Sequence, residues 1–299
     1  MDVGSMLGHR SDARTFTPTT GDELVLSQCT MGVEVELEGM YEVNRAMGMG
    51  RYASDFMKQY ISSDNEGNCV FGRGLWDVKR DGSLRNDGVE FVTKKLFGKD
   101  LIDGLDELHE FLNTDLIQGQ VSITNRCSTH VHMDIRDLTT TEFLRLLINY
   151  TIFEPVLFKY CEAGRDANLY CLPYFSSDAF KNVISEIHNA VLNDEDFTHS
   201  IRNFQKYSAC NLNAAARFGS IEFRMHQGTT DMHKLKDWIN ILMCLKQNAI
   251  GNSAEKLYNV VSDVGYESFL RDVFGKYAKD LYYEGATADI LAGVRLAQD

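Results

Sequence analysis

Four short segments of this chain alternate charged or imidazole side chains with apolar ones, and a period of two is the pattern of β-strands. They span residues 32–38, 88–92, 129–134 and 220–225. Because successive strand side chains point to opposite faces, each segment is predicted to carry one polar face and one apolar face. The apolar faces would contribute eight core residues: Val33, Val35, Val89, Phe91, Val131, Met133, Ile221 and Phe223.

The polar faces of these segments hold the side chains that can perform chemistry. They are Glu34 with Glu36, Glu90, His130 with His132, and Glu222 with Arg224. In one sheet, two carboxylates about 7 Å apart repel each other by roughly 2 kcal/mol at an effective dielectric constant of ~20. A wall of carboxylates therefore needs a counter-charge. A divalent metal is the simplest one, and oxygen ligands suit Mg²⁺ or Mn²⁺.

The composition excludes several classes of protein. A length of 299 residues allows one large domain or two small ones. The net charge of −13 argues against a general nucleic-acid or anionic-membrane binder, although it permits a local basic pocket for a phosphate. No apolar run reaches the roughly 20 residues of a membrane span, and the N-terminus lacks the apolar block of a secretory signal.

The cysteines indicate the compartment. The chain has seven, which is an odd number, and they are widely spaced without a CxxC pair. This pattern favours reduced thiols over a disulfide framework or a zinc site. A cytoplasmic protein is therefore predicted.

The predicted fold class is α+β, a single antiparallel sheet with helices packed on its apolar face. Residues 1–22 are polar and predict a flexible N-terminal arm, and residues 23–299 predict one catalytic domain. Within that domain, residues 41–76 are interpreted as an insertion with a short helix near 52–61. Further helices are predicted from capping and apolar periodicity over about 139–157, 178–192 and 231–245, and the C-terminal part is predicted to be helical.

The order of the motifs resembles the amidoligase family, in the carboxylate–amine ligase superfamily that also holds glutamine synthetase and glutamate–cysteine ligase. The matching segments are residues 32–36, Trp76 with 81–84, 88–92, 129–132, 211–213, and 220–224 with Gly228-Thr229. The resemblance implies a curved antiparallel sheet, similar to the glutamine synthetase catalytic domain. Its concave face would hold ATP and divalent cations. It also implies an ATP-dependent reaction that joins a carboxylate to an amine.

The resemblance assigns roles to individual residues. It implies metal ligands at Glu34, Glu36, Glu90, His130 and Glu222. It implies that His132 contacts phosphate and that Arg224 holds the transferring phosphoryl group, so that Arg224, Glu90 and His132 form the catalytic set. Glutamine synthetase carries a second carboxylate beyond the position of Glu90, and Asp81 is a candidate for it here.

Three arginines near these motifs have two interpretations each. Arg217 is a candidate for binding the nucleotide or the substrate from the segment before Arg224, or a solvated surface residue. Arg80 and Arg85 flank the turn Asp81-Gly82-Ser83, where either could meet a substrate carboxylate or only solvent. Residue types alone do not separate these alternatives.

The expected function is an ATP- and Mg²⁺- or Mn²⁺-dependent ligase that forms an amide or peptide-like bond through an acyl phosphate. Its partners would be ATP, a carboxylate substrate and an amine such as an amino acid, a peptide or a polyamine, and it is a candidate for homo-oligomer formation. The first alternative is a kinase on the same fold. The second is a non-catalytic metal-binding structural or interaction protein.

Overall fold

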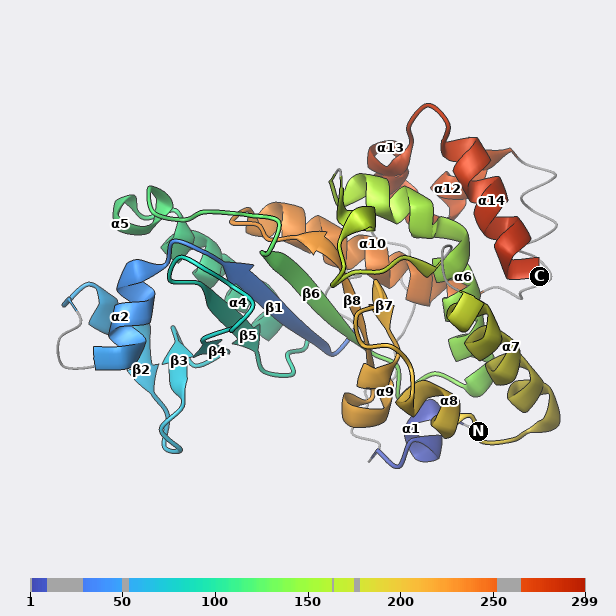
Figure 1. The fold of residues 1–299 in the computed structure, drawn as a ribbon, viewed down its shortest axis with the longest axis horizontal. Helices are drawn as coiled ribbons and strands as arrows, with labels where there is room; N and C mark the ends of the chain where they lie inside the picture. Colours follow the sequence, from blue (N-terminus) through green and yellow to red (C-terminus); the bar gives the residue numbers. More distant parts are fainter. Residues whose placement is uncertain are drawn as a thin grey trace. The chain divides into compact units, whose positions relative to one another are not determined.

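The computed structural model describes residues 2–9, 29–49, 54–162, 164–174, 178–251 and 265–298. These residues form two compact units, whose elements are labelled in Figure 1. Unit 1 contains the described parts of Met1–Cys29, Met133–Met225 and Asp237–Asp299, and unit 2 contains those of Thr30–His132 and His226–Lys236.

The strands follow the period-two segments of the sequence. They are β1 (Met31–Leu37), β2 (Ile61–Ser63), β3 (Cys69–Phe71), β4 (Trp76–Lys79), β5 (Val89–Thr93), β6 (Ser128–Asp134), β7 (Cys210–Asn211) and β8 (Ser220–Gln227). Their order in the sheet is β2-β3-β4-β5-β1-β6-β8-β7. Neighbours are antiparallel in β1/β5, β2/β3, β3/β4, β4/β5 and β7/β8. The α+β class with an antiparallel sheet packed against helices is thus confirmed.

The sheet is neither closed nor strongly curled, which differs from the curved sheet that the family resemblance implied. Sheets curl strongly when long strands coil or when the two edges pair. Here the edge strands β2 and β7 are only three and two residues long. Such short edges leave few backbone groups to pair, so the sheet stays open.

The helices occupy the remaining described segments. They are α1 (Val3–Met6), α2 (Tyr41–Met49), α3 (Met57–Tyr60), α4 (Lys99–Leu112), α5 (Asp115–Gln118), α6 (Thr140–Tyr160), α7 (Asp178–Asn193), α8 (Thr198–Arg202), α9 (Asn213–Phe218), α10 (Met232–Gly251), α12 (Tyr266–Phe274), α13 (Ala278–Leu281) and α14 (Ala286–Gln298). The predicted capping box begins α6, where Thr139 and Glu142 each accept the other's backbone N–H. Within the described ranges, none of these helices has the length and apolarity that crossing a membrane requires.

In unit 2, α4 packs against the apolar face of the sheet. The rings of Phe71 and Phe91 lie 4.9 and 6.4 Å from the ring of Phe111 on α4. Trp76 of β4 donates its indole N–H to the carbonyl of Gly104 at 3.0 Å, so the largest core side chain of this unit has its polar atom satisfied. This packing holds β1, β4 and β5 in place beneath their polar faces.

In unit 1, α6 packs against β8 and against the C-terminal helices. The Tyr150 ring lies 5.7 Å from the Phe223 ring of β8. On the same helix, Phe153 contacts Phe269 and Phe274 of the α12 region at 5.2 and 4.9 Å. The eight apolar residues that the sequence predicts for the core are all 0% exposed.

Two segments add detail to the expected organisation. In the predicted arm, Val3 is buried and donates its N–H to the carbonyl of Leu138 at 2.8 Å, while residues 10–22 lie outside the described residues. The predicted insertion 41–76 contains α2, α3 and the β2/β3 hairpin, and part of the helix expected near 52–61 is α3. Residues 50–53 lie outside the description. One catalytic domain over residues 23–299 stays a prediction.

Candidate functional site

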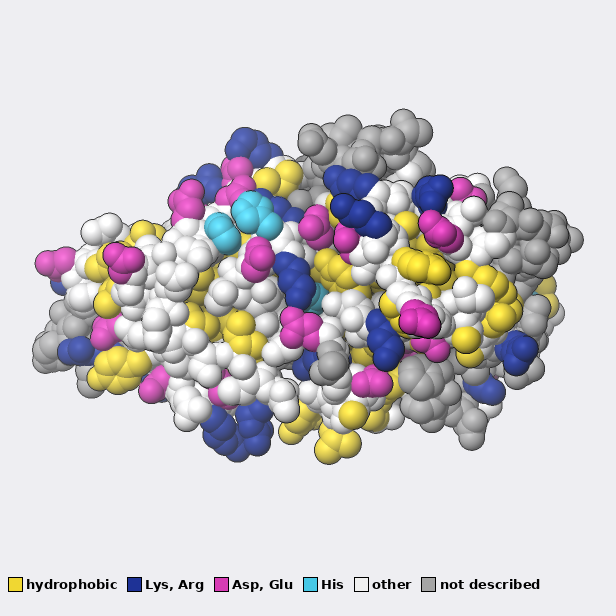
Figure 2. Space-filling model, turned by 90° about the horizontal axis from the view of Figure 1, so that it is seen from above, with side chains coloured by type: hydrophobic (Ala, Val, Ile, Leu, Met, Phe, Trp, Pro, Cys, Tyr) yellow, Lys and Arg dark blue, Asp and Glu magenta, His cyan; other side chains and the backbone are white. Residues whose placement is uncertain are grey.

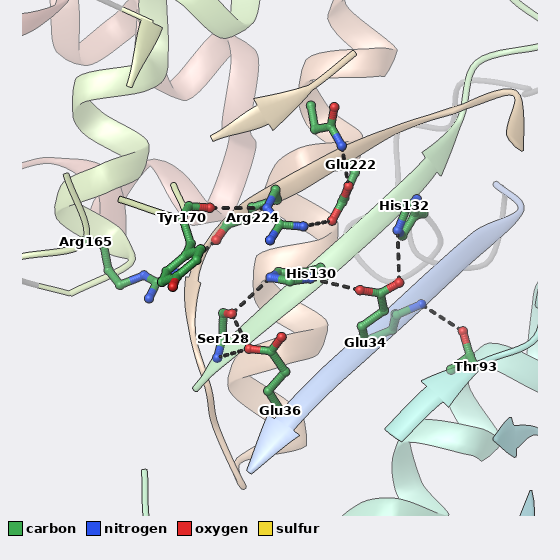
Figure 3. Close-up of polar contacts among 12 residues, drawn as sticks. Glu34, Glu36, Thr93, Ser128, His130, His132, Arg165, Tyr170, Glu222 and Arg224 are labelled. Carbon is green, nitrogen blue, oxygen red and sulfur yellow. Dashed lines mark hydrogen bonds and ion pairs between the residues drawn. The ribbon is translucent and has the colours of Figure 1, made fainter. Parts of the chain in front are cut away.

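In unit 2, the carboxylate of Glu34 lies between two imidazole rings (Figure 3). His130 Nδ1 is 2.9 Å from Oε2 of Glu34, and His132 Nε2 is 3.3 Å from Oε1. Both histidines come from β6, two residues apart, and therefore share one face of that strand. A side chain on Gly32 would meet the Cβ of His132 at 3.3 Å, so a glycine at this position leaves room for the ring beside β1.

Glu36, the next residue on this face of β1, is held by Ser128 at the start of β6. Both the backbone N–H and the hydroxyl of Ser128 donate to Oε2 of Glu36, at 2.9 and 2.5 Å. The same hydroxyl lies 3.0 Å from Nε2 of His130, which joins Glu34 and Glu36 through one hydrogen-bonded chain (Figure 3). Glu36 and His130 are only 6% and 3% exposed. Their orientations are therefore set by packing and by these hydrogen bonds.

Three carboxylates of unit 2 form a compact cluster. The antiparallel register places Glu36 of β1 directly opposite Glu90 of β5. Asp81, in the turn after β4, brings a third carboxylate to them, and one oxygen from each residue lies within 4.8 Å of the others. Carboxylates directly opposite each other on a sheet destabilise it unless a cation or a proton neutralises one of them. Lys79 is paired with Glu90 in the β4/β5 register but is exposed.

The environment shifts the pKa values of two of these carboxyl groups in opposite directions. Burial, followed by the charges of Glu34 and Glu36, raises the pKa of Glu90 to about 7. For Glu34, burial alone would raise the pKa, but the hydrogen bonds and charges of His130 and His132 hold it well below its ordinary value. Glu90 thus lies mainly among like charges, whereas Glu34 has its own hydrogen-bond donors.

The donors of the cluster fit a hard divalent cation. Glu36, Asp81 and Glu90 offer oxygen ligands only, without a thiol or imidazole, which is the ligand type of Mg²⁺ and Mn²⁺. Asp81 is itself oriented, because one of its oxygens accepts the N–H of Ser83 at 2.5 Å. Ser128 orients Glu36 in the same manner. Such second-layer hydrogen bonds are typical of carboxylates that bind metals.

Unit 1 contains the predicted residues of β8. Glu222 pairs with the guanidinium of Arg224, and its other oxygen accepts the side-chain amide of Asn211 at 2.7 Å (Figure 3). The β7/β8 register places Asn211 directly opposite Glu222. The Nε of Arg224 also donates to the carbonyl of Tyr170 at 3.3 Å. Glu222 is 6% exposed, so this carboxylate is buried with both a cation and an amide.

Arg165 supports β8 at Arg224 and Met225. It is 5% exposed, and its guanidinium donates to the carbonyls of Arg224 and Met225, each at 2.9 Å. Arg165 and Tyr170 belong to one short segment after α6. That segment therefore holds both the backbone and the guanidinium of Arg224.

Each unit brings several of the predicted residues together. Unit 2 brings together Glu34, Glu36, Glu90, His130 and His132, and unit 1 holds Glu222 with Arg224. Arg217, the third candidate for binding the nucleotide, lies in the last turn of α9. It is exposed, and its guanidinium lies 5.0 Å from the centre of the Phe218 ring.

Four supporting residues were not predicted from the sequence. Ser128 lies two residues before His130, so strand alternation predicts that it shares a face with His130 and His132. Arg126, which contacts the turn that contains Asp81, has no comparable signal. Neither do Arg165 and Tyr170, because they contact β8 from a distant loop.

Comparison with known protein families identifies the family of the chain. A family model described as "Putative amidoligase enzyme" matches residues 27–245, which is more than half of the chain. The protein therefore belongs to this family, whose name indicates a carbon–nitrogen ligase. None of the curated proteins compared with the chain matches it. The family resemblance inferred from the sequence motifs is confirmed.

Proposed function

We propose that this protein is an ATP-dependent ligase, assisted by Mg²⁺ or Mn²⁺, that joins a carboxylate to an amine through an acyl phosphate. One observation carries the proposal. In a chain of the amidoligase family, Glu36, Asp81 and Glu90 place three carboxylates within 4.8 Å of one another. Burial and the charges of Glu34 and Glu36 raise the pKa of Glu90 to about 7, which supports a cluster that a bound cation would stabilise.

The chemistry of amide formation explains why such a protein would use ATP. A carboxylate is a poor acylating agent and must be activated. One of its oxygens would attack the terminal phosphorus of ATP, the bond to the bridging oxygen would break, and ADP would leave. The amine would then attack the acyl carbon. Phosphate would depart with one former carboxylate oxygen, and the amine would lose a proton.

Residues of unit 2 would hold the metal. Glu36, Asp81 and Glu90 would be the ligands, Ser128 would keep Glu36 in place, and Glu90 would release its proton on binding. When bound, the cation would supply positive charge beside the phosphate groups, where phosphoryl transfer needs it. Glu34 and His130 would be metal ligands in the adjoining part of the site, as the resemblance implies, and His132 would contact a phosphate.

Arg224 keeps its proposed role at the transferring phosphoryl group. A guanidinium offers two parallel donors to phosphoryl oxygens, which an ammonium group cannot match. Glu222 and the Tyr170 carbonyl fix its orientation in unit 1. The roles of Glu222 as a metal ligand and of Arg217 as a nucleotide contact rest on the resemblance and on sequence position.

The test is a screen for ADP release with amino acids, polyamines and peptides in the presence of Mg²⁺ or Mn²⁺. For an active pair, an ¹⁸O-labelled carboxylate should transfer label to inorganic phosphate. Glu90→Gln should abolish turnover. Glu107→Gln, which alters a carboxylate of α4 that lies beside Arg73, should leave turnover unchanged. Label in AMP would contradict the acyl phosphate.

The alternatives give different products. A kinase would release ADP while the phosphate remained on the acceptor, so no free labelled phosphate would form. A non-catalytic metal-binding protein would bind Mn²⁺ without any turnover. Equal turnover in Glu90→Gln and the wild type would contradict the assigned role of the cluster.

A further inference from the structure

The turn that carries Asp81 is fixed to the end of β1. Asn86 and Asp87 adopt left-handed conformations, with φ of 50° and 56°, which cost a non-glycine residue about 1 kcal/mol or more. They are retained because the Asn86 carbonyl accepts the N–H of Gly39 at 2.7 Å and the Asp87 carbonyl accepts that of Met40 at 3.2 Å. The turn is therefore a preorganised part of unit 2.

A buried carboxylate strengthens this connection. Glu38, just beyond β1, is 1% exposed and accepts the backbone N–H of Arg85 at 2.7 Å. The hydrogen bond fixes the point from which the Arg85 side chain leaves the turn. Glu38 thus positions Arg85 through its backbone N–H.

Two guanidinium groups converge on this turn. Nη1 of Arg85 donates to the carbonyls of Gly82 and Leu84, at 3.3 and 3.2 Å. Nη1 of Arg126 donates to the carbonyl between them, that of Ser83, at 3.2 Å. Both cations therefore contact the same stretch of three residues, whose consecutive Cα atoms are about 3.8 Å apart. Each guanidinium has five N–H donors, and these contacts use only one nitrogen of each.

Neither cation is neutralised by a carboxylate of the described residues, although the chain has a net charge of −13. Other arginines here do form ion pairs: Arg73 lies within 3.7 Å of Asp103 and Glu107, and Arg136 within 2.7 Å of Asp134. Figure 2 shows basic and acidic side chains interspersed over the face in view. Because the net charge of the chain is −13, attraction of an anion to this turn would come from the local pair of cations.

We propose that Arg85 and Arg126 form an oxyanion-binding site that holds a non-reacting carboxylate of the substrate or a phosphate of the nucleotide. Charge-assisted N–H donors anchored on a rigid turn are suited to both groups. The position of this site in the reaction rests on the proposed function, because the same turn carries Asp81 of the carboxylate cluster. If a carboxylate is bound, the substrate is a dicarboxylate or an amino acid, with one group to react and another to be held.

The experiment is a thermal titration of the full chain, with Mn²⁺ present, using succinate, butyrate, inorganic phosphate and ADP as probes. Succinate should bind at least about tenfold more tightly than butyrate, since it has the additional carboxylate. Arg85→Gln and Arg126→Gln should each abolish that difference. Arg73→Gln, a matched loss of an exposed but ion-paired guanidinium, should retain it.

The probes distinguish the two sources of the oxyanion. If a nucleotide phosphate is bound instead, both variants should weaken ADP and phosphate about tenfold while succinate and butyrate bind alike. A wild-type measurement avoids reliance on the variants: saturating anion should protect Arg85 and Arg126 from phenylglyoxal, as mapped by mass spectrometry. Unchanged affinities in both folded variants, or unprotected arginines, would overturn the proposal.

The outcome is separable from that of the proposed function. The anion titrations are repeated with EDTA in place of Mn²⁺, using phosphate as the probe. Phosphate binding that depends on the arginines, in a protein that releases no ADP with any acid, would retain the oxyanion site and reject the ligase. ADP release that is unchanged in Arg85→Gln and Arg126→Gln would retain the ligase and reject the site.

Discussion

The two units handle buried carboxylates in different ways. In unit 1, Glu222 has the guanidinium of Arg224 and the amide of Asn211 as partners. In unit 2, Glu36 faces another carboxylate, Glu90, across the β1/β5 pair, and Asp81 adds a third. A carboxylate that is neutralised within the protein stabilises the fold by itself, whereas an uncompensated cluster stores repulsion that a bound cation would relieve.

The contrast also explains what each region is suited to do. Glu222 and Arg224 hold each other in a fixed geometry, which suits a group that must present a guanidinium. Glu90, with its pKa raised to about 7, titrates near neutral pH. It is therefore suited to release its proton when a metal ion binds. Removing one carboxylate should therefore have opposite effects on stability in the two units.

The largest effect is expected from breaking the ion pair of unit 1. Arg224→Met should lower the free energy of unfolding by about 3 kcal/mol, because it leaves the carboxylate of Glu222 buried without its cation. The double variant Arg224→Met with Glu222→Gln should recover most of this loss. Urea denaturation at constant m-value measures it. A loss below about 1 kcal/mol would show that solvent already screens the pair.

The second effect concerns metal binding in unit 2. Mn²⁺ at a hundredfold of its Kd should stabilise the wild type by about 2.7 kcal/mol, since it would bind only the folded state. Glu36→Gln, Asp81→Asn and Glu90→Gln should each remove most of this increase, as measured by calorimetry. Glu107→Gln is the matched control on α4. Equal stabilisation of all four variants would place the cation elsewhere.

The third effect is the pH dependence that Glu90 confers. Its pKa of about 7 in the folded protein exceeds the ordinary value of 4.5, so its contribution is complete below about pH 4.5 and is lost as the pH rises through 7. The metal-free protein should lose about 2 kcal/mol over this range, a value that allows for partial exposure. Glu34, whose pKa is lowered, acts in the opposite direction but only below its unfolded value.

Glu90→Gln tests this assignment directly. The amide cannot titrate, so the decrease between pH 4.5 and 7 should disappear, and at pH 8 the metal-free variant should be more stable than the wild type. Glu222→Gln should instead be less stable than the wild type at pH 8. A stability profile of Glu90→Gln that is parallel to that of the wild type would assign the pH dependence to another group.

The smallest effect is expected from removing the uncharged hydrogen-bond donors of Glu36 and Glu222. Ser128→Ala removes a hydroxyl from Glu36, and Asn211→Ala removes an amide from Glu222. Each should lower the free energy of unfolding by about 1.5 kcal/mol, as expected for a hydrogen bond to a charged group. Only Ser128→Ala should also weaken Mn²⁺ binding, by about tenfold or more, because the Ser128 hydroxyl orients a proposed metal ligand. Equal Mn²⁺ affinities would remove Ser128 from the metal site.

Much of the fold and part of the site could be read from the sequence. The period of two identified β1, β5, β6 and β8, and it separated their buried apolar faces from their polar ones, because alternation is a local property of an extended backbone. It also grouped Glu34 with Glu36 and His130 with His132. The same motifs, taken in order, identified the family.

Tertiary structure decided which of these groups meet and which are neutralised. The β1/β5 register puts Glu90 opposite Glu36, and the folded turn brings in Asp81. Arg165 reaches β8, and Arg126 reaches the Ser83 carbonyl, across long stretches of sequence. Such contacts depend on strand register and loop path, which side-chain periodicity does not encode. The sequence thus determined which face of each strand is polar, and only the folded chain determined which carboxylates face one another.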